Sequence, residues 1–443
     1  MKQNDQTRHQ RKVYFYHLKK CGGTSLNDWL DLQVPDSAVW RPDWSGEVYR
    51  YVSGERDVTE MSSAHAQHRA LATSAFYWSD IVHSHVPMRQ FVPAGTLSFT
   101  VLRNPVNRLL SQISDWRRLG PADVSNLAAP YRECIEDARR MRMKSFLEKH
   151  GLQFGRHLLD NYLVRALAAS RIGMLAAKIE HVADMLPLAL EAIEQDFDIV
   201  GLTERDEETR RIVCARLGWC PAASIPFLNR TDSASRMRDE LDEAGALLAE
   251  LTQHDAKLYA RAEKLFDAER EMVGNYNFGV FEAGAAVDAT RRLPAHHVDG
   301  HVAFSVREQV VGCGFYGRDA AGTQHCAIWT GPEAVARLYM PVPVRVELTV
   351  YLWVRGYADE RQRDQLKIRI DGKTIAHRFE HCDGYRDRIA IDMVSTREFA
   401  CIEVVLDATT TSGAADQPGY DSRLRGVCFD RYSWSFRGIK PGP

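Results

Sequence analysis

Short apolar segments alternate with longer amphipathic segments over roughly the first 285 residues of the chain. Compact apolar runs at residues 13–17, 97–102 and 197–202 are typical of buried strands. Strands separated by helices favour a parallel sheet with helical cover, so this part is predicted to have an α/β fold. The helix-like patterns between and after the strands cover residues 105–119, 131–150, 158–177 and 233–268.

The pattern changes after about residue 300. Residues 344–352 (VRVELTVYL) alternate apolar and polar over most of their length, and residues 366–370 (LKIRI) precede the pair Asp371-Gly372. Such a pair between alternating strands is a strong signal for a two-residue hairpin. The C-terminal part is therefore predicted to be an all-β antiparallel sandwich. Further strand-like runs lie at residues 388–393, 400–406 and 426–436.

These two patterns divide the chain into predicted domains. Residues 1–284 form the α/β domain, residues 285–300 a linker, and residues 301–443 the β-sandwich. A length of 443 residues suits two or three domains. The linker sequence HHVDGH at residues 296–301 is interpreted as a polar, solvated connection, with a metal site as the alternative.

Composition narrows the classes of function. The formal net charge is −2, so nothing global favours nucleic acid or an anionic membrane surface. The nine cysteines are scattered without a CxxC pair, which favours reduced thiols in a cytoplasm over a disulfide framework. The basic N-terminus precedes no apolar signal region, and no stretch approaches the ~20 apolar residues of a membrane helix. We therefore expect neither secretion by a standard signal nor a transmembrane segment.

The segment HLKKCGGTSL at residues 17–26 has the composition of a phosphate-binding turn. Gly22 and Gly23 allow a sharp turn with exposed N–H groups. Thr24 and Ser25 then open a helix, whose N-terminus favours an anion, and Lys20 adds a full positive charge. The alternative is that the glycine pair only makes a tight turn between strand and helix.

The spacing in this segment differs from that of a nucleoside triphosphatase. A Walker loop reads GxxxxGK[ST], with the lysine directly before the hydroxyl residue that holds Mg²⁺. Here Lys20 comes before the glycines. This order favours a phosphosulfate or bisphosphate ligand that requires no metal.

A second strand, turn and helix follow at residues 97–112 (LSFTVLRNPVNRLLSQ). Arg103 leaves the end of the strand and can bind a phosphate through two donors. Pro105 suits the first turn of a helix, and Ser111 lies about two turns later on a face that could meet the same ligand. Taken singly, Arg103 could be a surface charge and Ser111 a neutral helix residue.

The two segments resemble the 5′-phosphosulfate-binding and 3′-phosphate-binding motifs of glycan sulfotransferases that use 3′-phosphoadenylyl sulfate (PAPS). The chain resembles bacterial sulfotransferase family 2 and uronosyl 2-O-sulfotransferase-like enzymes in particular. This resemblance covers roughly residues 12–275. The chain has Lys19 and Cys21 where the family usually has proline and threonine. The resemblance implies a P-loop-like sulfotransferase fold, PAPS as donor and a glycan acceptor. Weaker echoes are DNYLVRALA at residues 160–168, IVGLTER at 199–205 and LNRT at 228–231.

The resemblance also implies roles for individual residues. Lys20 would stabilise the oxygen that leaves with the phosphate. In the run IVHSHVP, His83 and His85 point to one face of an extended chain. His85 is the predicted catalytic base, with His83 supporting it or contacting the acceptor; satisfied structural histidines are the alternative, and a zinc site lacks further ligands. The predicted donor-binding residues are Lys20, Gly22, Gly23, Thr24, Ser25, Arg103, Ser111 and, more weakly, Arg230.

Two other functions stay open. One is a small-molecule kinase with a related P-loop-like core, against which the missing GK[ST] counts. The other is a glycan-binding protein whose transferase core has decayed. The C-terminal region resembles β-sandwich modules of bacterial polysaccharide-building enzymes, which implies a glycan-binding or accessory role. We expect a bacterial cytoplasmic enzyme that sulfates a polysaccharide, lipid-linked oligosaccharide or glycolipid precursor; a location at the periphery of the inner membrane is the alternative.

Overall fold

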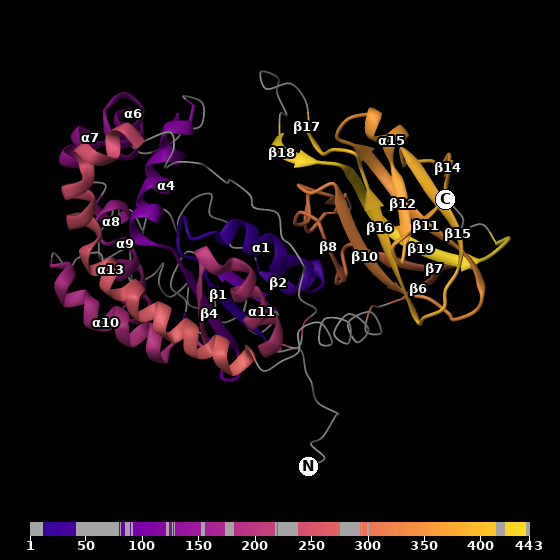
Figure 1. Ribbon diagram of the computed structural model, residues 1–443, viewed down its shortest axis with the longest axis horizontal. Helices are drawn as coiled ribbons and strands as arrows, with labels where there is room; N and C mark the ends of the chain where they lie inside the picture. The colour runs from indigo at the N-terminus through magenta and orange to yellow at the C-terminus, as the bar shows by residue number, and fades with distance from the viewer. Residues whose placement is uncertain are drawn as a thin grey trace, which may run out of the picture. The chain divides into compact units, whose positions relative to one another are not determined.

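The computed structural model divides into two compact units, which are described separately (Figure 1). The α/β unit comprises Met1–Gly23, Trp40–Thr209 and Asn229–Val273, and the β unit comprises Thr24–Val39, Arg210–Leu228 and Gly274–Pro443. The structure describes residues 12–40, 79, 81–84, 89, 92–120, 124–125, 127, 129–151, 156–172, 181–217, 219, 238–274, 293, 295–298, 301–323, 325–412 and 421–439.

A parallel sheet forms the centre of the α/β unit. Strand β1 pairs in parallel with β3 on one side and β4 on the other, and β4 pairs in parallel with β5. Every residue of β1 and β4 is buried, as expected for a parallel sheet that is covered on both faces. The predicted α/β arrangement is thereby confirmed. The strand order is β2 (Val39–Trp40), β3 (Ile81–Ser84), β1 (Val13–Tyr16), β4 (Leu97–Leu102) and β5 (Ile199–Leu202).

The helix α4 (Pro105–Arg118) matches its prediction closely and begins with two local signals. The side chain of Asn104 accepts the N–H of Asn107 as an N-cap, and Pro105 occupies the first turn. The other described helices of this unit are α6 (Ala129–Arg140), α7 (Met143–His150), α8 (Arg156–Leu159), α9 (Tyr162–Ile172), α10 (Val182–Gln195) and α13 (Arg238–Gly274). Helices α1 (Gly23–Leu32) and α11 (Asp206–Leu217) have residues in both units.

Two long predicted helices are divided in the structure. The range 131–150 becomes α6 and α7, because Met141 O accepts from Arg117 and the Met143 N–H donates to Glu240. In the range 158–177, the described residues 158–172 are divided between α8 and α9, with Asn161 between them at φ 45°; residues 173–177 lie outside the described part of the chain. At this second break the Asn161 N–H donates to the Leu251 carbonyl, so at both breaks long-range hydrogen bonds replace those that would continue the helix. Among the described helices, none combines the length and apolar character needed to cross a membrane.

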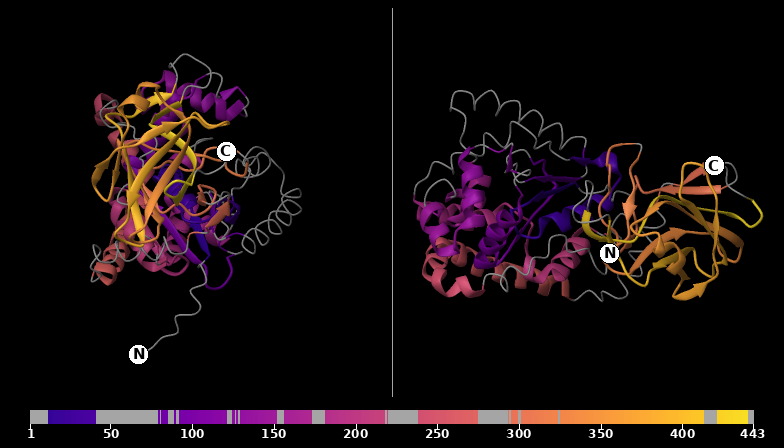
Figure 2. Two further views of the ribbon diagram at one scale, coloured as in Figure 1. Left: turned by 90° about the vertical axis from the view of Figure 1, so that its right-hand side faces the viewer. Right: turned by 90° about the horizontal axis from the view of Figure 1, so that it is seen from above.

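Antiparallel strands make up most of the β unit (Figure 2), which confirms the change of pattern predicted after residue 300. One sheet has the order β13-β12-β16-β10-β8, and the other has β14-β15-β11-β19-β7-β6 with β9 paired to β19. Strands β17 and β18 pair with each other as a separate two-stranded sheet. The bounds are β6 (His296–Val298), β7 (His301–Ser305), β8 (Gly312–Cys313), β9 (Ile328–Trp329), β10 (Val335–Pro341), β11 (Glu347–Tyr357), α15 (Arg361–Gln365), β12 (Lys367–Ile370), β13 (Lys373–Ile375), β14 (Arg378–Glu380), β15 (Asp387–Val394), β16 (Phe399–Val405), β17 (Thr410–Ser412), β18 (Asp421–Arg425) and β19 (Val427–Phe436).

One hydrophobic core is shared by both sheets of the β unit. The alternating apolar residues of β11 supply Leu348, Val350 and Leu352 to this core. The predicted hairpin at Asp371-Gly372 is confirmed, because β12 and β13 pair on either side and both turn residues have positive φ, 48° and 79°. The other sheet supplies Leu338 and Met340 of β10 and Ile402 and Val404 of β16, and the sheet of β11 also supplies Ile391 of β15 and Phe429 of β19.

An early segment of the chain packs inside the β unit. Arg318 is buried and donates hydrogen bonds to four carbonyl oxygens, those of Asp31, Val34, Val306 and Glu308. Leu32 belongs to the shared hydrophobic core. Residues 24–39 are therefore part of the β unit, although they precede most of it by more than 250 residues. Strand β6 lies within the range predicted as a linker and pairs with β7.

Candidate anion-binding site

The connections that leave β1 and β4 run in opposite directions across the sheet. From β1 the chain continues to β2 and then β3 on one side, whereas from β4 it continues to β5 on the other. The carboxyl ends of two such neighbouring strands are the usual ligand site of an open α/β sheet. Residues 19–22 follow β1 and Arg103 follows β4, so the topology brings both predicted phosphate-binding segments to this position.

The turn after β1 requires its glycines for two different reasons. Gly22 has φ 76°, and a Cβ there would also lie 3.3 Å from Cγ2 of Thr203. At Gly23 a Cβ would lie 1.9 Å from Cδ2 of His17, whose ring is stacked on Phe15. Lys20 also takes a left-handed conformation, with φ 64°, which is uncommon for a residue with a side chain. Gly23 is the first residue of α1, as the sequence predicted for the start of a helix near Thr24.

Three side chains from distant parts of the α/β unit hold the backbone of this turn. They come from the end of β4, from the residue after β5 and from α9. An unusual backbone conformation persists where its surroundings specify it in this way, and such positions cluster at functional sites. The three hydrogen bonds are Arg103 Nη1 to the Lys20 carbonyl (3.1 Å), Thr203 Oγ1 to the Cys21 carbonyl (2.9 Å) and the Lys19 N–H to the Tyr162 hydroxyl (2.8 Å).

The ammonium of Lys20 has a carboxylate as its partner. Its Nζ lies 3.0 Å from Oδ2 of Asp115 on α4, and Asp115 also pairs with Arg118. The side chains of Lys20 and Asp115 are 21% and 30% exposed, so dissolved anions can reach them. Burial lowers the pKa of Lys20, and the Asp115 carboxylate opposes that shift. The turn therefore presents a cation whose counter-charge an incoming anion can replace.

The side chain of Cys21 faces the interior. It is 2% exposed, and its Sγ lies 3.7 Å from the carbonyl oxygen of Lys19. Burial raises the pKa of this thiol to about 12, so it stays protonated near neutral pH. The departure from the family motif at this position thus concerns packing beneath the turn. Arg108 lies in the same interior, with its guanidinium 4.5 Å from the centroid of the Tyr162 ring.

Side chains are described for only some of the remaining predicted site residues. Ser111 lies on α4 and is 6% exposed; Thr24 is exposed and Ser25 is buried at the start of α1. His83 lies in β3, opposite Phe15, but its side chain is not described. His85 and Arg230 lie outside the described residues, so their roles stay predictions.

Four further residues of this region carry no role in the sequence interpretation. Asp115 lies four positions after Ser111, a spacing that places both on one face of α4. Thr203 and Glu204 belong to the segment IVGLTER, and Tyr162 to DNYLVRALA; in sequence both segments are only weakly similar to glycan sulfotransferases. Their contacts with the two turns depend on how distant segments pack, which no local pattern reveals.

No protein-family model matches the chain, and no curated protein matches it either. Within the described part of the chain, no group of three His, Cys, Asp or Glu side chains is arranged to hold a metal ion. The described site is therefore defined by its own geometry: two cationic strand-end segments in direct contact at the topological switch point of a parallel sheet.

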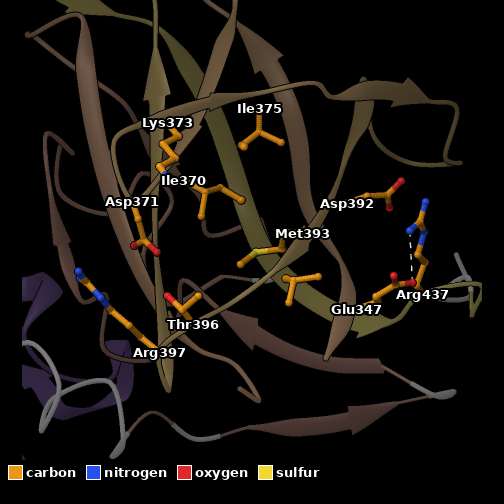
Figure 3. A pocket seen from close by; sticks show the side chains of 11 residues that line it. Glu347, Ile370, Asp371, Lys373, Ile375, Asp392, Met393, Thr396, Arg397 and Arg437 are labelled. Atoms are coloured by element: carbon orange, nitrogen blue, oxygen red, sulfur yellow. Dashed lines mark hydrogen bonds and ion pairs between the residues drawn. The ribbon is translucent and has the colours of Figure 1, made fainter. Parts of the chain in front are cut away.

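The β unit contains a separate cavity of about 630 Å³ (Figure 3). Ile370, Ile375 and Met393 form its apolar middle, and Arg437 pairs with Glu347 at its edge, 3.3 Å apart. None of its lining residues is aromatic, so it offers no ring on which a sugar could stack. Those lining residues also include no histidine, cysteine or serine, and we do not assign the predicted sulfuryl transfer to this cavity.

Proposed function

We propose that the protein is a PAPS-dependent sulfotransferase that transfers a sulfuryl group to a hydroxyl of a glycan. In this proposal the α/β unit has the P-loop-like sulfotransferase fold, and the β unit is a β-sandwich with a glycan-binding or accessory role. The observation that carries it is the contact between Arg103 and the turn of Lys20. One nucleotide with phosphates at both its 5′ and 3′ positions would meet both segments.

The residues present fit such a donor. Lys20 and Arg103 place two cations at the switch point, and the N–H groups at the start of α1 follow directly in the chain. Thr24, the predicted ligand of the 5′-phosphate, follows Gly23 directly in the chain and is exposed in the first turn of this ten-residue helix. Arg103 and Ser111 would hold the 3′-phosphate, which distinguishes PAPS from adenylyl sulfate.

The reaction is a displacement at sulfur. The bond from the acceptor oxygen to sulfur forms while the bond from sulfur to the bridging phosphate oxygen breaks, and the hydroxyl proton passes to a base. When bound, the donor supplies the sulfuryl group and the nucleotide leaving group. Lys20 neutralises the charge that develops on the bridging oxygen, which is an electrostatic contribution that this chemistry requires.

The proposed base comes from the segment that follows β3. This strand ends at Ser84, beside β1 in the sheet and parallel to it, so its chain leaves at the same edge as the turn of Lys20. We retain His85 as the base and His83 as its support. An imidazole suits this task because its pKa lies near neutral pH.

Binding of adenosine 3′,5′-bisphosphate (PAP), the desulfated product, tests the proposal. Calorimetry on the full chain should detect PAP at micromolar concentrations, and ATP with Mg²⁺ should bind at least about tenfold more weakly. Incubation with ³⁵S-labelled PAPS and a panel of polysaccharides should then transfer label to a glycan. Tighter binding of ATP with Mg²⁺ would favour the kinase, and PAP binding without transfer to any acceptor would favour a decayed transferase.

A further inference from the structure

The segment IVGLTER contacts both of the strand-end segments described above. Strands β4 and β5 pair in parallel with Leu102 opposite Leu202, so the two strands end at the same level. Thr203 is the next residue and begins the short helix η4 (Thr203–Arg205). Its Oγ1 lies 2.9 Å from the carbonyl oxygen of Cys21 and 3.1 Å from that of Leu102. One hydroxyl is therefore within hydrogen-bonding distance of the turn after β1 and of the last residue of β4.

The neighbouring Glu204 adds a second link on the β4 side. Its Oε1 accepts the N–H of Asn104, the N-cap of α4, at 2.9 Å. Its Oε2 accepts the hydroxyl of Tyr259 on α13 at 2.8 Å. The carboxylate thus holds the residue that follows Arg103, and α13 in turn holds the carboxylate.

The contact with the first turn is close as well as polar. A Cβ on Gly22 would lie 3.3 Å from Cγ2 of Thr203, so the methyl group of Thr203 lies close to the position where a side chain on this residue would begin. The hydroxyl and the methyl group of one side chain therefore contact the two adjacent residues Cys21 and Gly22. Movement of the turn relative to β4 would break at least one of these contacts.

We propose that Thr203 is a positioning residue that sets the separation between the 5′-phosphate-binding and 3′-phosphate-binding segments. This inference rests on the proposed function and deepens it. A ligand with phosphates at both ends depends on that separation, because the entropic advantage of a second contact is lost when the two sites are misplaced. A ligand with a 5′-phosphate alone, such as AMP, does not depend on it.

The matched variants are Thr203→Val, Thr203→Ser and Thr209→Val. Thr203→Val removes the hydroxyl and keeps the methyl-bearing shape, whereas Thr203→Ser keeps the hydroxyl. Thr209 is a nearby control that is more deeply buried than Thr203; its Oγ1 bonds to the backbone N–H and carbonyl of Leu202, at 3.1 and 3.2 Å. Calorimetry gives the Kd of each full-length variant for PAP and for AMP, and thermal unfolding gives its Tm.

We expect Thr203→Val to raise the Kd for PAP about tenfold, which corresponds to one hydrogen bond, and the Kd for AMP less than about threefold. Thr203→Ser and Thr209→Val should keep both values within about threefold of the wild type. If Thr203→Val does not fold, Thr203→Ala is measured in its place with the same expectation.

Three results overturn the inference alone. Equal loss of PAP and AMP affinity in Thr203→Val, or the same loss in Thr209→Val, would assign Thr203 a general structural role. Wild-type binding of PAP by Thr203→Val would show that its hydroxyl does not set the separation of the two segments. Failure of the wild-type protein to bind PAP at all would instead overturn the proposed function, and this inference with it.

Discussion

The guanidinium of Arg103 donates a hydrogen bond to the carbonyl oxygen of Lys20 at 3.1 Å, which joins two segments 83 positions apart in the chain. Their side chains bring two positive charges to the ends of neighbouring strands. Such an arrangement is unfavourable without an anion, and Asp115 supplies one at 3.0 Å from the Lys20 ammonium. We therefore expect an anionic ligand to take the place of the Asp115 carboxylate beside the Lys20 ammonium.

Replacement of Lys20 should lower the rate of sulfuryl transfer without unfolding the protein. We expect Lys20→Ala to lower kcat for sulfuryl transfer by about 10²- to 10³-fold, as when one donor to a developing anion is removed. Lys144→Ala, at an exposed position of α7, is the control and should leave kcat unchanged. The measurement is ³⁵S transfer at saturating donor, with circular dichroism to verify the fold. Wild-type turnover in Lys20→Ala would contradict the assigned role.

Ser111 should affect recognition of the 3′-phosphate specifically. A hydrogen bond from its hydroxyl to a charged phosphate would be worth about 1.5–3 kcal/mol, so Ser111→Ala should weaken PAP binding about tenfold or more. The affinity for AMP, which lacks the 3′-phosphate, should stay near the wild-type value. Ser114→Ala, a buried serine one turn later on α4, controls for loss of a hydroxyl from this helix. Equal effects of the two substitutions on PAP would argue against a ligand contact.

Asp115 should compete with the donor for Lys20. Because Asp115→Asn removes the counter-charge, we expect PAP to bind a few-fold more tightly and the difference from the wild type to shrink at high salt. Titrations at low and high ionic strength measure both effects. Asp239→Asn, at an exposed position in the first turn of α13, controls for the change in net charge. Weaker PAP binding by Asp115→Asn would show instead that this carboxylate orients the lysine.

Asp255 should make the stability of the α/β unit depend on pH. Its two carboxylate oxygens accept the N–H groups of Leu163 and Val164 at the start of α9, 3.1 and 2.8 Å away. Burial nevertheless raises the pKa of Asp255 to about 7, whereas a carboxyl in the unfolded chain ionises near pH 4. Between these values folding takes up a proton, so this group makes the unfolding free energy fall as pH rises from about 4 to about 7.

Denaturant unfolding at pH 5, 6, 7 and 8 measures this contribution. The wild type should lose a few kcal/mol over the range on account of Asp255, and Asp255→Asn, which cannot ionise, should show a shallower decline. Asp242→Asn, at an exposed position on the same helix, should retain the wild-type slope. The diagnostic quantity is the slope, because asparagine also replaces one acceptor oxygen by a donor. Identical slopes for Asp255→Asn and the wild type would contradict the assignment.

Local patterns were sufficient for the elements that carry their own signals. The Asp371-Gly372 hairpin, the start of α4 at Pro105 and the buried strand β4 all depend on neighbours within a few residues, and each occurs as predicted. The prediction of continuous helices at 131–150 and 158–177 was wrong, because hydrogen bonds to distant residues interrupt both. Glu240 accepts the N–H of Met143, and Asp255 accepts those at the start of α9, so hydrogen bonds from α13 decide where those helices begin.

The same distinction holds for the site. Glycines, lysine, arginine and serine at suitable spacing could be read from the chain, because the turn and helix start that they require are formed by contiguous residues. The contact between Arg103 and Lys20, the ion pair with Asp115 and the bridge made by Thr203 could not, since each joins residues from different strands or helices. Residue order dictates the local backbone and charge, whereas the packing of the parallel sheet dictates which of those charges meet.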